Sequence, residues 1–372
     1  MNKNIEDVKI LHLAPDEKFI DMALRSFSAT GSQNDVIVFS DTSLKHVKSE
    51  VLRHASLTSY NKRTILSIME KYDIIVMHSL FSLKFKFPKS VKVIWIGFGY
   101  DYYDLVDNIE LLMPNTKAEF LSRTLKGRMK GFVKKHLMVD LLKRKIKSKF
   151  IERIDIFAPV LTREYDLISW SGKKPALSDW NYGTLEDDWS YPGVDRITGA
   201  NVLLGNSATI TCNHIDGLKF LSDQWQDHRV ILPLSYGDSK YKKELKTYLS
   251  SRSDKFPELE CLDDFMQFND YIRLISSCSY AVMPHMRQQA VGNIFILMYM
   301  GCKVFLNRNN PVYLFLIESG AIVYSIEDLK NKESKQPLTN EQLEINRNFL
   351  KSYISRDVML RKTNRLIESA MS

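Results

Sequence analysis

Short runs of Val, Ile and other apolar residues recur along this chain, and segments long enough to form a helix separate them. In the first part of the chain these runs lie at 8–13, 35–40, 72–79 and 91–99, and a strand followed by a helix is expected within 154–168. Apolar strands that alternate with helices are typical of βαβ units, whose parallel strands share one sheet. The pattern therefore predicts an α/β fold.

The same pattern starts again after a change in composition. Residues 171–199 are rich in Gly, Pro, Ser and Asp and have few periodic apolar positions, which is typical of a linker. A second α/β series is therefore expected beyond residue 199. Its strands are expected at 200–207, 228–235, 257–265, 278–284, 302–308 and 320–325.

Length and composition agree with two domains. A chain of 372 residues is longer than one ordinary domain, and 44% hydrophobic with 26% charged residues is typical of a globular protein. We expect an N-terminal domain at 1–170, a linker at 171–199, a C-terminal domain at 200–338, and a helical stretch at 339–372 that packs back on the N-terminal domain. Both domains are expected to be doubly wound and Rossmann-like, and to face a cleft.

The cysteines and the apolar runs bear on the cellular compartment. The four cysteines show neither C-x-x-C pairing nor zinc-site spacing, so we expect reduced thiols of a cytosolic protein. The N-terminal residues become acidic before any apolar stretch of signal-peptide length. No apolar run approaches the roughly 18 residues that span a bilayer. The sequence therefore predicts a soluble or peripheral protein.

Positive charge is concentrated in one segment. The formal net charge of the chain is +8, yet twelve Lys or Arg residues and only two acidic residues lie between Lys117 and Lys149. Apolar residues recur in this segment at helical spacing, which predicts an amphipathic helix with a cationic face. Such a helix either lies on an anionic lipid surface or packs on the sheet with a solvated basic face. Nucleic acid is not expected as a partner, because no aromatic residues suited to base stacking interleave the lysines.

Three strand ends in the second series carry glycines and small polar residues. They are the G-N-S stretch at 205–207, the S-Y-G stretch at 235–237, and the R-Q-Q-A-V-G stretch at 287–292, which precedes an apolar helix. A helix N-terminus with unpaired N–H groups attracts phosphate, and the guanidinium of Arg287 offers forked donors to phosphate oxygens. The alternative is that the glycines only form turns and that Arg287 is a solvated surface charge.

Common nucleotide and metal signatures do not fit. The chain contains no G-x-x-x-x-G-K-[ST] stretch, and no G-x-G-x-x-G follows its first strand. The acidic stretches at 101–104 and 186–188 are not D-x-D pairs, so a pyrophosphate held by a metal ion is not expected.

In the following motifs the second half of the chain resembles glycosyltransferase family 56, the bacterial TDP-N-acetylfucosamine:lipid II N-acetylfucosaminyltransferases. The resemblance rests on G-N-S-x6-H at 205–214, L-P-L-S-Y at 232–236, R-Q-Q-A-V-G at 287–292 and F-L-N-R-N-N-P at 305–311. The N-terminal half is similar more faintly, at 95–105 and 160–168.

The resemblance implies a GT-B fold and a hexosyltransferase that depends on a nucleotide sugar and on no metal ion or other cofactor. The donor implied is TDP-4-acetamido-4,6-dideoxygalactose. The acceptor implied is a polyprenyl-pyrophosphate-linked glycan of enterobacterial common antigen synthesis, and an O-antigen or capsule pathway is equally reasonable. The enzyme would then lie peripherally on the cytoplasmic face of the bacterial inner membrane, with the basic segment on anionic lipid.

The resemblance also suggests roles for single residues. Arg287 would compensate charge on the leaving nucleotide, Tyr236 would stack on the base or flank it, and His214 would either reach a phosphate or cap its helix. The donor-binding residues expected are Gly205, Asn206, Ser207, His214, Pro233, Tyr236, Gly237, Arg287, Gln288, Gln289, Gly292, Asn293, Asn307 and Asn310. The membrane-binding residues expected are Lys126, Arg128, Lys130, Lys134, Lys135, Lys143, Arg144 and Lys145.

Two residues are candidates for the general base that an inverting transfer needs. Asp101 follows a buried strand, and the alternative role for it is a helix cap or a turn. His78 lies just inside another strand end, where a core histidine is the alternative. A retaining reaction would need no dedicated base. Two other functions fit the same architecture: a sugar-nucleotide epimerase, and a non-catalytic membrane adaptor.

Overall fold

The computed structural model describes residues 3–125, 143–221, 225–252 and 255–372. The chain forms two compact units. The first unit contains residues 1–108, 130–188 and 354–372, and the second contains 109–129 and 189–353. Each unit is described by itself below.

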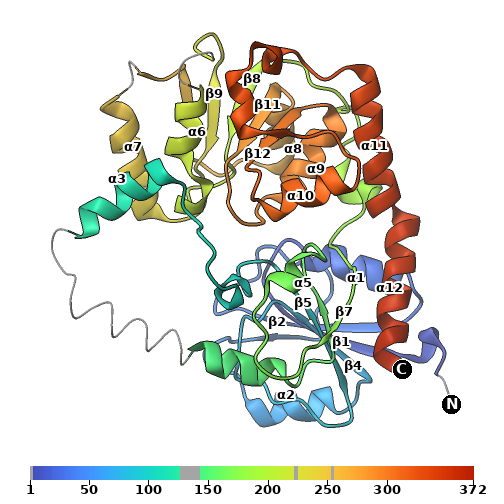
Figure 1. Ribbon diagram of the computed structural model, residues 1–372. Helices are drawn as coiled ribbons and strands as arrows, with labels where there is room; N and C mark the ends of the chain where they lie inside the picture. Colours follow the sequence, from blue (N-terminus) through green and yellow to red (C-terminus); the bar gives the residue numbers. More distant parts are fainter. Residues whose placement is uncertain (1–2, 126–142, 222–224, 253–254) are drawn as a thin grey trace. The chain divides into compact units, whose positions relative to one another are not determined.

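A seven-stranded sheet forms the centre of the first unit, in the order β3-β2-β1-β4-β5-β6-β7 (Figure 1). All its strand pairs are parallel. The strands are β1 (Lys9–Pro15), β2 (Gln33–Phe39), β3 (Arg53–Ala55), β4 (Ile74–His78), β5 (Lys92–Ile96), β6 (Ile156–Ala158) and β7 (Ala176–Leu177). The helices are α1 (Ile20–Ser28), α2 (Lys62–Met69), residues 143–151, α5 (Glu164–Leu167) and α12 (Arg356–Met371).

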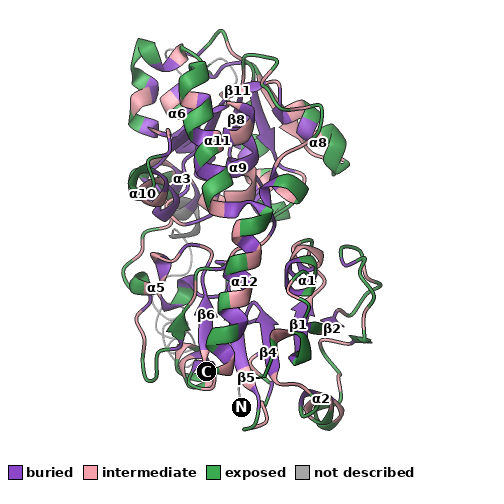
Figure 2. Ribbon diagram, turned by 90° about the vertical axis from the view of Figure 1, so that its right-hand side faces the viewer, coloured by how far each residue is buried: buried purple, intermediate pink, exposed green. Residues whose placement is uncertain are grey.

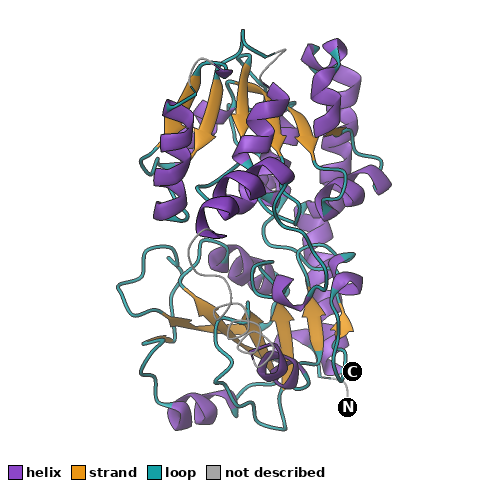
Figure 3. Ribbon diagram, turned by 60° about the vertical axis from the view of Figure 1, so that its left-hand side comes forward, coloured by secondary structure: helices purple, strands orange, loops and turns teal. Residues whose placement is uncertain are grey.

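The second unit contains a six-stranded sheet in the order β10-β9-β8-β11-β12-β13, again with parallel pairs only. Helices and strands alternate along the chain, and the helices pack on the sheets (Figure 3). The strands are β8 (Asn201–Leu204), β9 (Val230–Pro233), β10 (Leu259–Leu262), β11 (Cys278–Met283), β12 (Lys303–Leu306) and β13 (Tyr324–Ser325). The helices are α3 (Pro114–Leu125), α6 (His214–Leu221), α7 (Ser239–Ser250), α8 (Phe268–Ile275), α9 (Val291–Met300), α10 (Pro311–Glu318) and α11 (Asn340–Ile354).

The predicted α/β class with two parallel sheets is confirmed, and each expected apolar run contains a strand. The central strands are buried on both faces, whereas α12 has a buried and an exposed face (Figure 2). The sequence pattern missed β3 and β7. Both are two or three residues long, lie at the sheet edge and are largely exposed, so they lack an apolar run.

The expected domain limits need correction at two places. Residues 171–188, which were expected to be linker, belong to the first unit, where β7 pairs with β6. The indole of Trp180 is buried and its Nε1–H donates to Thr363 Oγ1 of α12 at 2.9 Å. Gly, Pro and Asp in this stretch therefore shape a loop that is packed on the domain.

The second correction concerns α3, which was expected in the N-terminal domain but belongs to the second unit. The buried carboxylate of Asp216 accepts hydrogen bonds from the backbone N–H groups of Asn115 and Thr116, at 3.0 and 2.8 Å, and from the Asn115 side chain at 2.8 Å. Asn213 Oδ1 accepts from the N–H of Met113 at 2.9 Å. The start of α3 is thus capped by side chains from α6 and the turn before it, about a hundred residues away.

We expect Asp216→Ala to lower the free energy of unfolding by about 2–3 kcal/mol, because three donors at the N-terminus of α3 lose a charged acceptor. Urea denaturation of both proteins would measure the change. Asp270→Ala is the matched control, since Asp270 lies in the first turn of α8 with an exposed side chain. Equal stability losses in the two variants would contradict the capping role of Asp216.

Candidate functional sites

The turn after β8 brings a histidine close to the backbone in the second unit. Gly205 has φ +68°, and a Cβ built there would lie 2.9 Å from Nε2 of His214. Glycine therefore fits this position both by conformation and by space. His214 is fully buried, and its Nδ1 shares a hydrogen bond of 2.9 Å with the hydroxyl of Tyr241. Its Nε2 makes no hydrogen bond within the described residues.

A network of side-chain amides links three strand ends at this edge of the sheet. Asn206, after β8, donates from Nδ2 to the hydroxyl of Tyr236, after β9, at 2.9 Å. Gln289, which follows β11, donates from Nε2 to Asn206 Oδ1 at 2.9 Å. Thr211 donates from Oγ1 to Gln289 Oε1 at 2.9 Å. The predicted residues Asn206, Tyr236 and Gln289 are therefore brought together, as expected for strand ends of one parallel sheet.

Beneath this network lies Cys212, which is fully buried and 3.3 Å from Gln289 Nε2. Burial raises the pKa of its thiol, but the neighbouring His285 and His214 outweigh that effect and bring the pKa well below its usual range. His285 is also fully buried. The edge of the second sheet thus contains a thiol with a lowered pKa and two buried imidazoles.

Helix α9 begins immediately after the R-Q-Q stretch. Ala290, its N-cap, has φ +61° and an apolar side chain, so the first turn of the helix is not capped by it. A Cβ on Gly292 would lie 2.6 Å from the indole of Trp189, so this glycine is required for packing. Asn293 donates to the hydroxyl of Tyr271 at 3.2 Å. A positive φ outside glycine costs about 1–3 kcal/mol and is typical of functional segments.

Some of the remaining predicted donor-binding residues already make hydrogen bonds that stabilise the fold. Asn310 caps α10, accepting from Val312 N at 2.8 Å, and donates to the carbonyl of His285 at 2.9 Å. Asn307 accepts from Asn309 N at 2.9 Å. The expectation that these amides contact a sugar stays a prediction, alongside the structural roles that they have here. Pro233 ends β9, Ser207 and Gln288 are buried, and Gly237 has φ +119° with Ala208 behind it.

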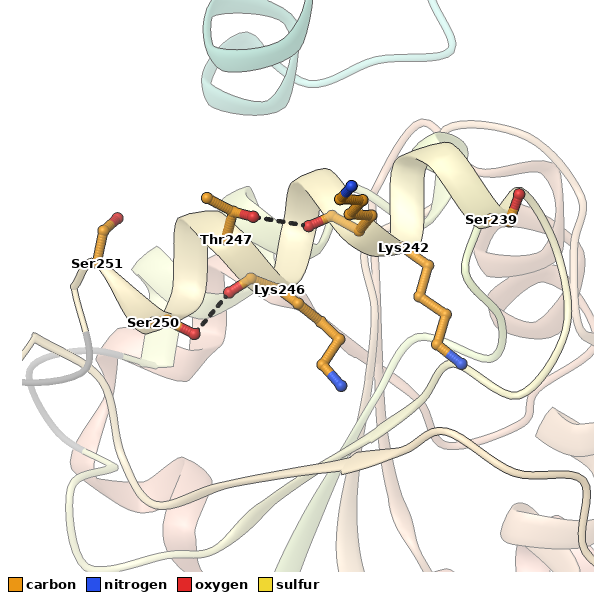
Figure 4. Close-up of a pocket in the computed structure, with 7 residues that line it drawn as sticks. Ser239, Lys242, Lys246, Thr247, Ser250 and Ser251 are labelled. Atoms are coloured by element: carbon orange, nitrogen blue, oxygen red, sulfur yellow. Dashed lines mark hydrogen bonds between the residues drawn. The ribbon is translucent and has the colours of Figure 1, made fainter.

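A hollow of about 740 Å³ runs along α7 (Figure 4). Ser239, Lys242, Lys246 and Ser250 are among the residues that line it, and all lining residues come from this helix or the residue after it. The ammonium groups of Lys242 and Lys246 pair with Asp263 at 3.1 and 2.6 Å. The hollow is the outer surface of a lysine-rich helix, separate from the amide network.

In the first unit, four side chains form a continuous chain of hydrogen bonds through the sheet. His78, at the end of β4, shares a bond of 2.7 Å between its Nδ1 and the hydroxyl of Tyr182. Its Nε2 lies 2.9 Å from Nδ1 of His12, on the neighbouring strand β1. Nε2 of His12 lies 3.2 Å from Oδ1 of Asn34. His78 is therefore not an isolated core histidine.

Both histidines are fully buried and neutral near pH 7. Burial lowers the pKa of His12 to about 4, although the bond to Asn34 and the charge of Asp35 act in the opposite direction. Burial and the adjacent His12 lower the pKa of His78 well below its usual value. The sequence offered one sign of this pair, a histidine in the middle of the apolar run at 8–13.

Asp101, the other predicted base, is engaged in structural contacts. Its buried carboxylate accepts from the backbone N–H groups of Leu80 and Phe98, at 2.9 and 2.8 Å, and from the indole N–H of Trp95 at 2.8 Å. Burial raises its pKa, while these donors act against that effect. The carboxylate thus ties the ends of β4 and β5 together, and its catalytic role stays a prediction.

Most of the predicted membrane residues lie outside the described part of the chain: Lys126, Arg128, Lys130, Lys134 and Lys135. Lys143 and Lys145 are exposed on the helix at 143–151. Arg144 bonds within the unit to Asp107 at 2.5 Å and to the carbonyl of Leu105 at 2.9 Å, and its membrane role stays a prediction. In the described residues no helix has the length and apolar character to cross a membrane.

Within the same described ranges, no cluster of three or more His, Cys, Asp or Glu side chains is arranged to hold a metal ion. The residues that sequence reasoning missed are Thr211, Cys212 and His285 in the second unit and His12, Asn34 and Tyr182 in the first. Except for His12, they carry no recognisable spacing, and only the fold brings them to the strand ends.

The buried histidines should make the stability of the protein fall below pH 6.5. Between that pH and about 4 the unfolded chain binds protons that folded His12 and His78 exclude, so stability rises with pH by up to about 1.4 kcal/mol per unit for each histidine. Urea denaturation at pH 7, 6 and 5 measures the slope. His12→Gln should reduce it, and the exposed His54→Gln should not. An unchanged slope in His12→Gln would contradict the prediction.

Comparisons with known proteins agree with this architecture. Residues 191–354 match the family model described as 4-alpha-L-fucosyltransferase glycosyl transferase group 56. Among solved structures, sucrose-phosphate synthase from Thermosynechococcus elongatus is similar with a TM-score of 0.63 and 10% identity, over 97% of this chain and 98% of that one. An alpha-glucosyltransferase in complex with UDP-glucose and DNA has a TM-score of 0.61 and 12% identity, over 97% and 99% of the two chains. A glycosyltransferase from Rickettsia africae has a TM-score of 0.60 and 14% identity, over 98% of both.

The structural similarity, at these low identities, shows the fold alone, which is the GT-B fold of two Rossmann-like domains. The family match adds the activity and covers the G-N-S turn, the amide network and the start of α9. The resemblance seen in the sequence is thereby confirmed for residues 191–354, which match the model of glycosyltransferase group 56, and the chain is a hexosyltransferase of the GT-B fold.

Proposed function

We propose that this enzyme transfers a 4-acetamido-4,6-dideoxyhexose from a TDP-sugar to a polyprenyl-pyrophosphate-linked glycan in bacterial surface polysaccharide synthesis. The observation that carries the proposal is the family match over residues 191–354, which contain the whole polar network at the strand ends. A transferase also gives these residues a function that a membrane adaptor would not use. An epimerase does not account for the match.

The second unit offers the groups that a nucleotide diphosphate needs. The first turn of α9 presents backbone N–H groups and the positive end of a helix dipole, and Arg287 lies four residues before the helix. In a glycosyl transfer, negative charge grows on the leaving pyrophosphate as the bond to the sugar breaks. Main-chain donors and an arginine can stabilise that charge, so we propose that the reaction requires no metal ion and no other cofactor.

Base and sugar would lie on either side of this phosphate position. Tyr236 is about half exposed, at 53%, while its hydroxyl is fixed by Asn206, so its ring is available for stacking on a base. The UDP-glucose complex of the alpha-glucosyltransferase with the same fold supports a nucleotide sugar as the donor class. Asn293 and Gln289 would be close enough to the start of α9 to contact the sugar.

A lipid-linked acceptor requires the enzyme to work at a membrane surface, and two groups of basic residues support this. The basic segment 117–149 begins in α3, which packs on α7 through Phe120 and Tyr241, with ring centroids 5.0 Å apart. Lys243 and Lys246 are exposed on α7. Each basic residue near an anionic surface contributes about 1 kcal/mol. We therefore propose peripheral binding to the cytoplasmic face of the inner membrane.

TDP should raise the melting temperature of the wild type more than UDP, GDP or NAD do. A ligand at a hundred times its dissociation constant adds about 2.7 kcal/mol of stability, which thermal denaturation detects. Arg287→Ala should remove most of the shift, because the diphosphate loses a cationic partner. Arg273→Ala is the matched control, since Arg273 is an exposed arginine on α8. Absence of any shift in the wild type, or equal shifts in both variants, would contradict the donor site.

Charge reversal in the basic segment should weaken binding to vesicles that contain anionic lipid. We expect Lys130, Lys134 and Lys135→Glu together to reduce partitioning at least a hundredfold, at about 1 kcal/mol for each lysine. Co-sedimentation with phosphatidylglycerol vesicles measures the change. The control reverses three exposed lysines elsewhere, Lys62, Lys71 and Lys174, so that net charge is equal. Equal losses in both triple variants would show a general charge effect and contradict a membrane role for the segment.

A further inference from the structure

The hydrogen-bonded chain through the first sheet has a fixed direction. Asn34 donates from Nδ2 to the carbonyl and the hydroxyl of Ser32, at 2.7 and 3.0 Å, so its Oδ1 is left to accept from His12. His12 must then carry its proton on Nε2 and accept on Nδ1 from Nε2–H of His78. Nδ1 of His78 accepts in turn from the Tyr182 hydroxyl. One set of bonds thus determines both tautomers.

Such a chain is unusual among its surroundings. Strands β1 and β4 are otherwise apolar where they pair, with Ile10, Leu13, Ile74 and Met77 fully buried. Two neutral imidazoles in this position need their partners, because an unpaired buried polar group costs about 1–3 kcal/mol. Valine or leucine would fill the same space without that requirement. We therefore expect this chain of hydrogen bonds to have a function other than packing.

The open end of the chain lies at Tyr182, where several features typical of a functional site meet. Tyr182 is partly exposed, unlike the two histidines. Ser79, directly after His78, has φ +65°, and its hydroxyl lies 3.1 Å from that of Tyr100, which is 57% exposed. Phe98 borders the Tyr182 ring with centroids 5.2 Å apart. Strained backbone and exposed aromatic rings at the carboxyl end of a parallel strand are typical of a ligand-binding edge.

The loop that carries Tyr182 is held firmly on both sides. Trp180 is anchored to Thr363 of α12, and Asp188 forms a bidentate pair with Arg25 of α1, both bonds at 2.6 Å. The hydroxyl of Tyr182 is therefore positioned by the fold as well as by His78, which a group that handles a proton requires.

We propose that Tyr182, His78, His12 and Asn34 form the proton relay that deprotonates the acceptor hydroxyl. This rests on the proposed function. As the acceptor oxygen forms its bond to the sugar, its proton passes to the Tyr182 oxygen, and the Tyr182 proton passes to Nδ1 of His78. Nε2–H of His78 can then pass to Nδ1 of His12. The histidine pair holds the proton until it returns by the same path to water. The bond between the sugar and TDP breaks as the new bond forms, and TDP leaves with the electrons of the broken bond.

The relay explains the choice of groups better than a single carboxylate does. Asp101 already accepts three hydrogen bonds, whereas the histidine pair is neutral and has one acceptor atom, Nδ1 of His78, aimed towards the site. Asn34 accepts from His12 in both protonation states of the pair. Asp35 acts on His12 by its charge and favours the protonated form. In this scheme Tyr182 is the catalytic residue, and the other three are positioning residues.

The first test is Tyr182→Phe, which removes the hydroxyl and keeps the ring. We expect kcat to fall at least a hundredfold, the usual lower value for a general base, with TDP binding unchanged. The assay uses TDP-4-acetamido-4,6-dideoxygalactose and an undecaprenyl-pyrophosphate-linked disaccharide. Tyr165→Phe is the matched control, since its hydroxyl donates to the carbonyl of Pro175 at 2.8 Å in the same unit. A kcat within threefold of the wild type in Tyr182→Phe would overturn the relay.

A second variant changes the relay without cutting it. Asn34→Asp keeps an oxygen acceptor at His12 Nε2 and adds a negative charge, so the pair should bind its proton more readily. The acid limb of the pH profile of kcat should therefore move to higher pH. The groups that face the relay are Asp35 beside His12, and Tyr100 and Asp101 beside Tyr182. An unmoved acid limb in a folded Asn34→Asp variant would show that the residue is only structural.

Nitrogen NMR of ¹⁵N-histidine-labelled protein gives a readout that does not depend on turnover. Both His12 and His78, identified by single substitution, should be neutral Nε2–H tautomers at pH 6. An Nδ1–H tautomer or a charged ring at either position would overturn the relay. A wild type that binds no TDP and transfers no sugar would instead contradict the proposed function, and the tautomers would still test the hydrogen-bonded chain.

Discussion

Parallel pairing of the strands is the interaction on which both candidate sites depend. In a parallel sheet every strand runs in the same direction, so all carboxyl ends meet at one edge and the turns after them become neighbours. In the second unit this brings Asn206, Tyr236 and Gln289 together, although more than eighty residues separate the first from the last. In the first unit it places His12 beside His78 on adjacent strands.

The buried polar groups at these edges form their hydrogen bonds with one another. Because each of them needs its partner, these bonds make the sites rigid. Asn206 and Gln289 form a bonded pair through their amides, and Asn34, His12 and His78 fix one another's tautomers. A network of this kind is stable only when every member has a partner. A single substitution should therefore also destabilise the neighbouring residues of the network, because it leaves them without a partner. In the proposed reaction the groups for the donor and for the acceptor are thus already arranged before substrate binds, which favours electrostatic stabilisation and proton transfer.

The proposed function gives the two units different parts of the chemistry. The second unit offers a helix N-terminus, an arginine and amides, all of which suit a diphosphate and a sugar, and it is the part that matches group 56. The first unit offers neutral imidazoles and a tyrosine, which suit a proton. The positive charge of the basic segment has no direct role in donor binding or in proton transfer in this proposal. We propose that it determines where the enzyme works, at the membrane that holds a lipid-linked acceptor.

The sequence by itself determined the α/β class, the position of nearly every strand and the donor-side motifs, because these depend on local periodicity and on residues close together in the chain. It could not place α3, whose start is capped by Asp216 a hundred residues later, or recognise β3 and β7, which are short edge strands. It named His78 but not His12, Asn34 or Tyr182. Only the tertiary structure decided those partners, because the register of parallel strands and the packing of a distant loop bring together side chains that no spacing in the sequence relates.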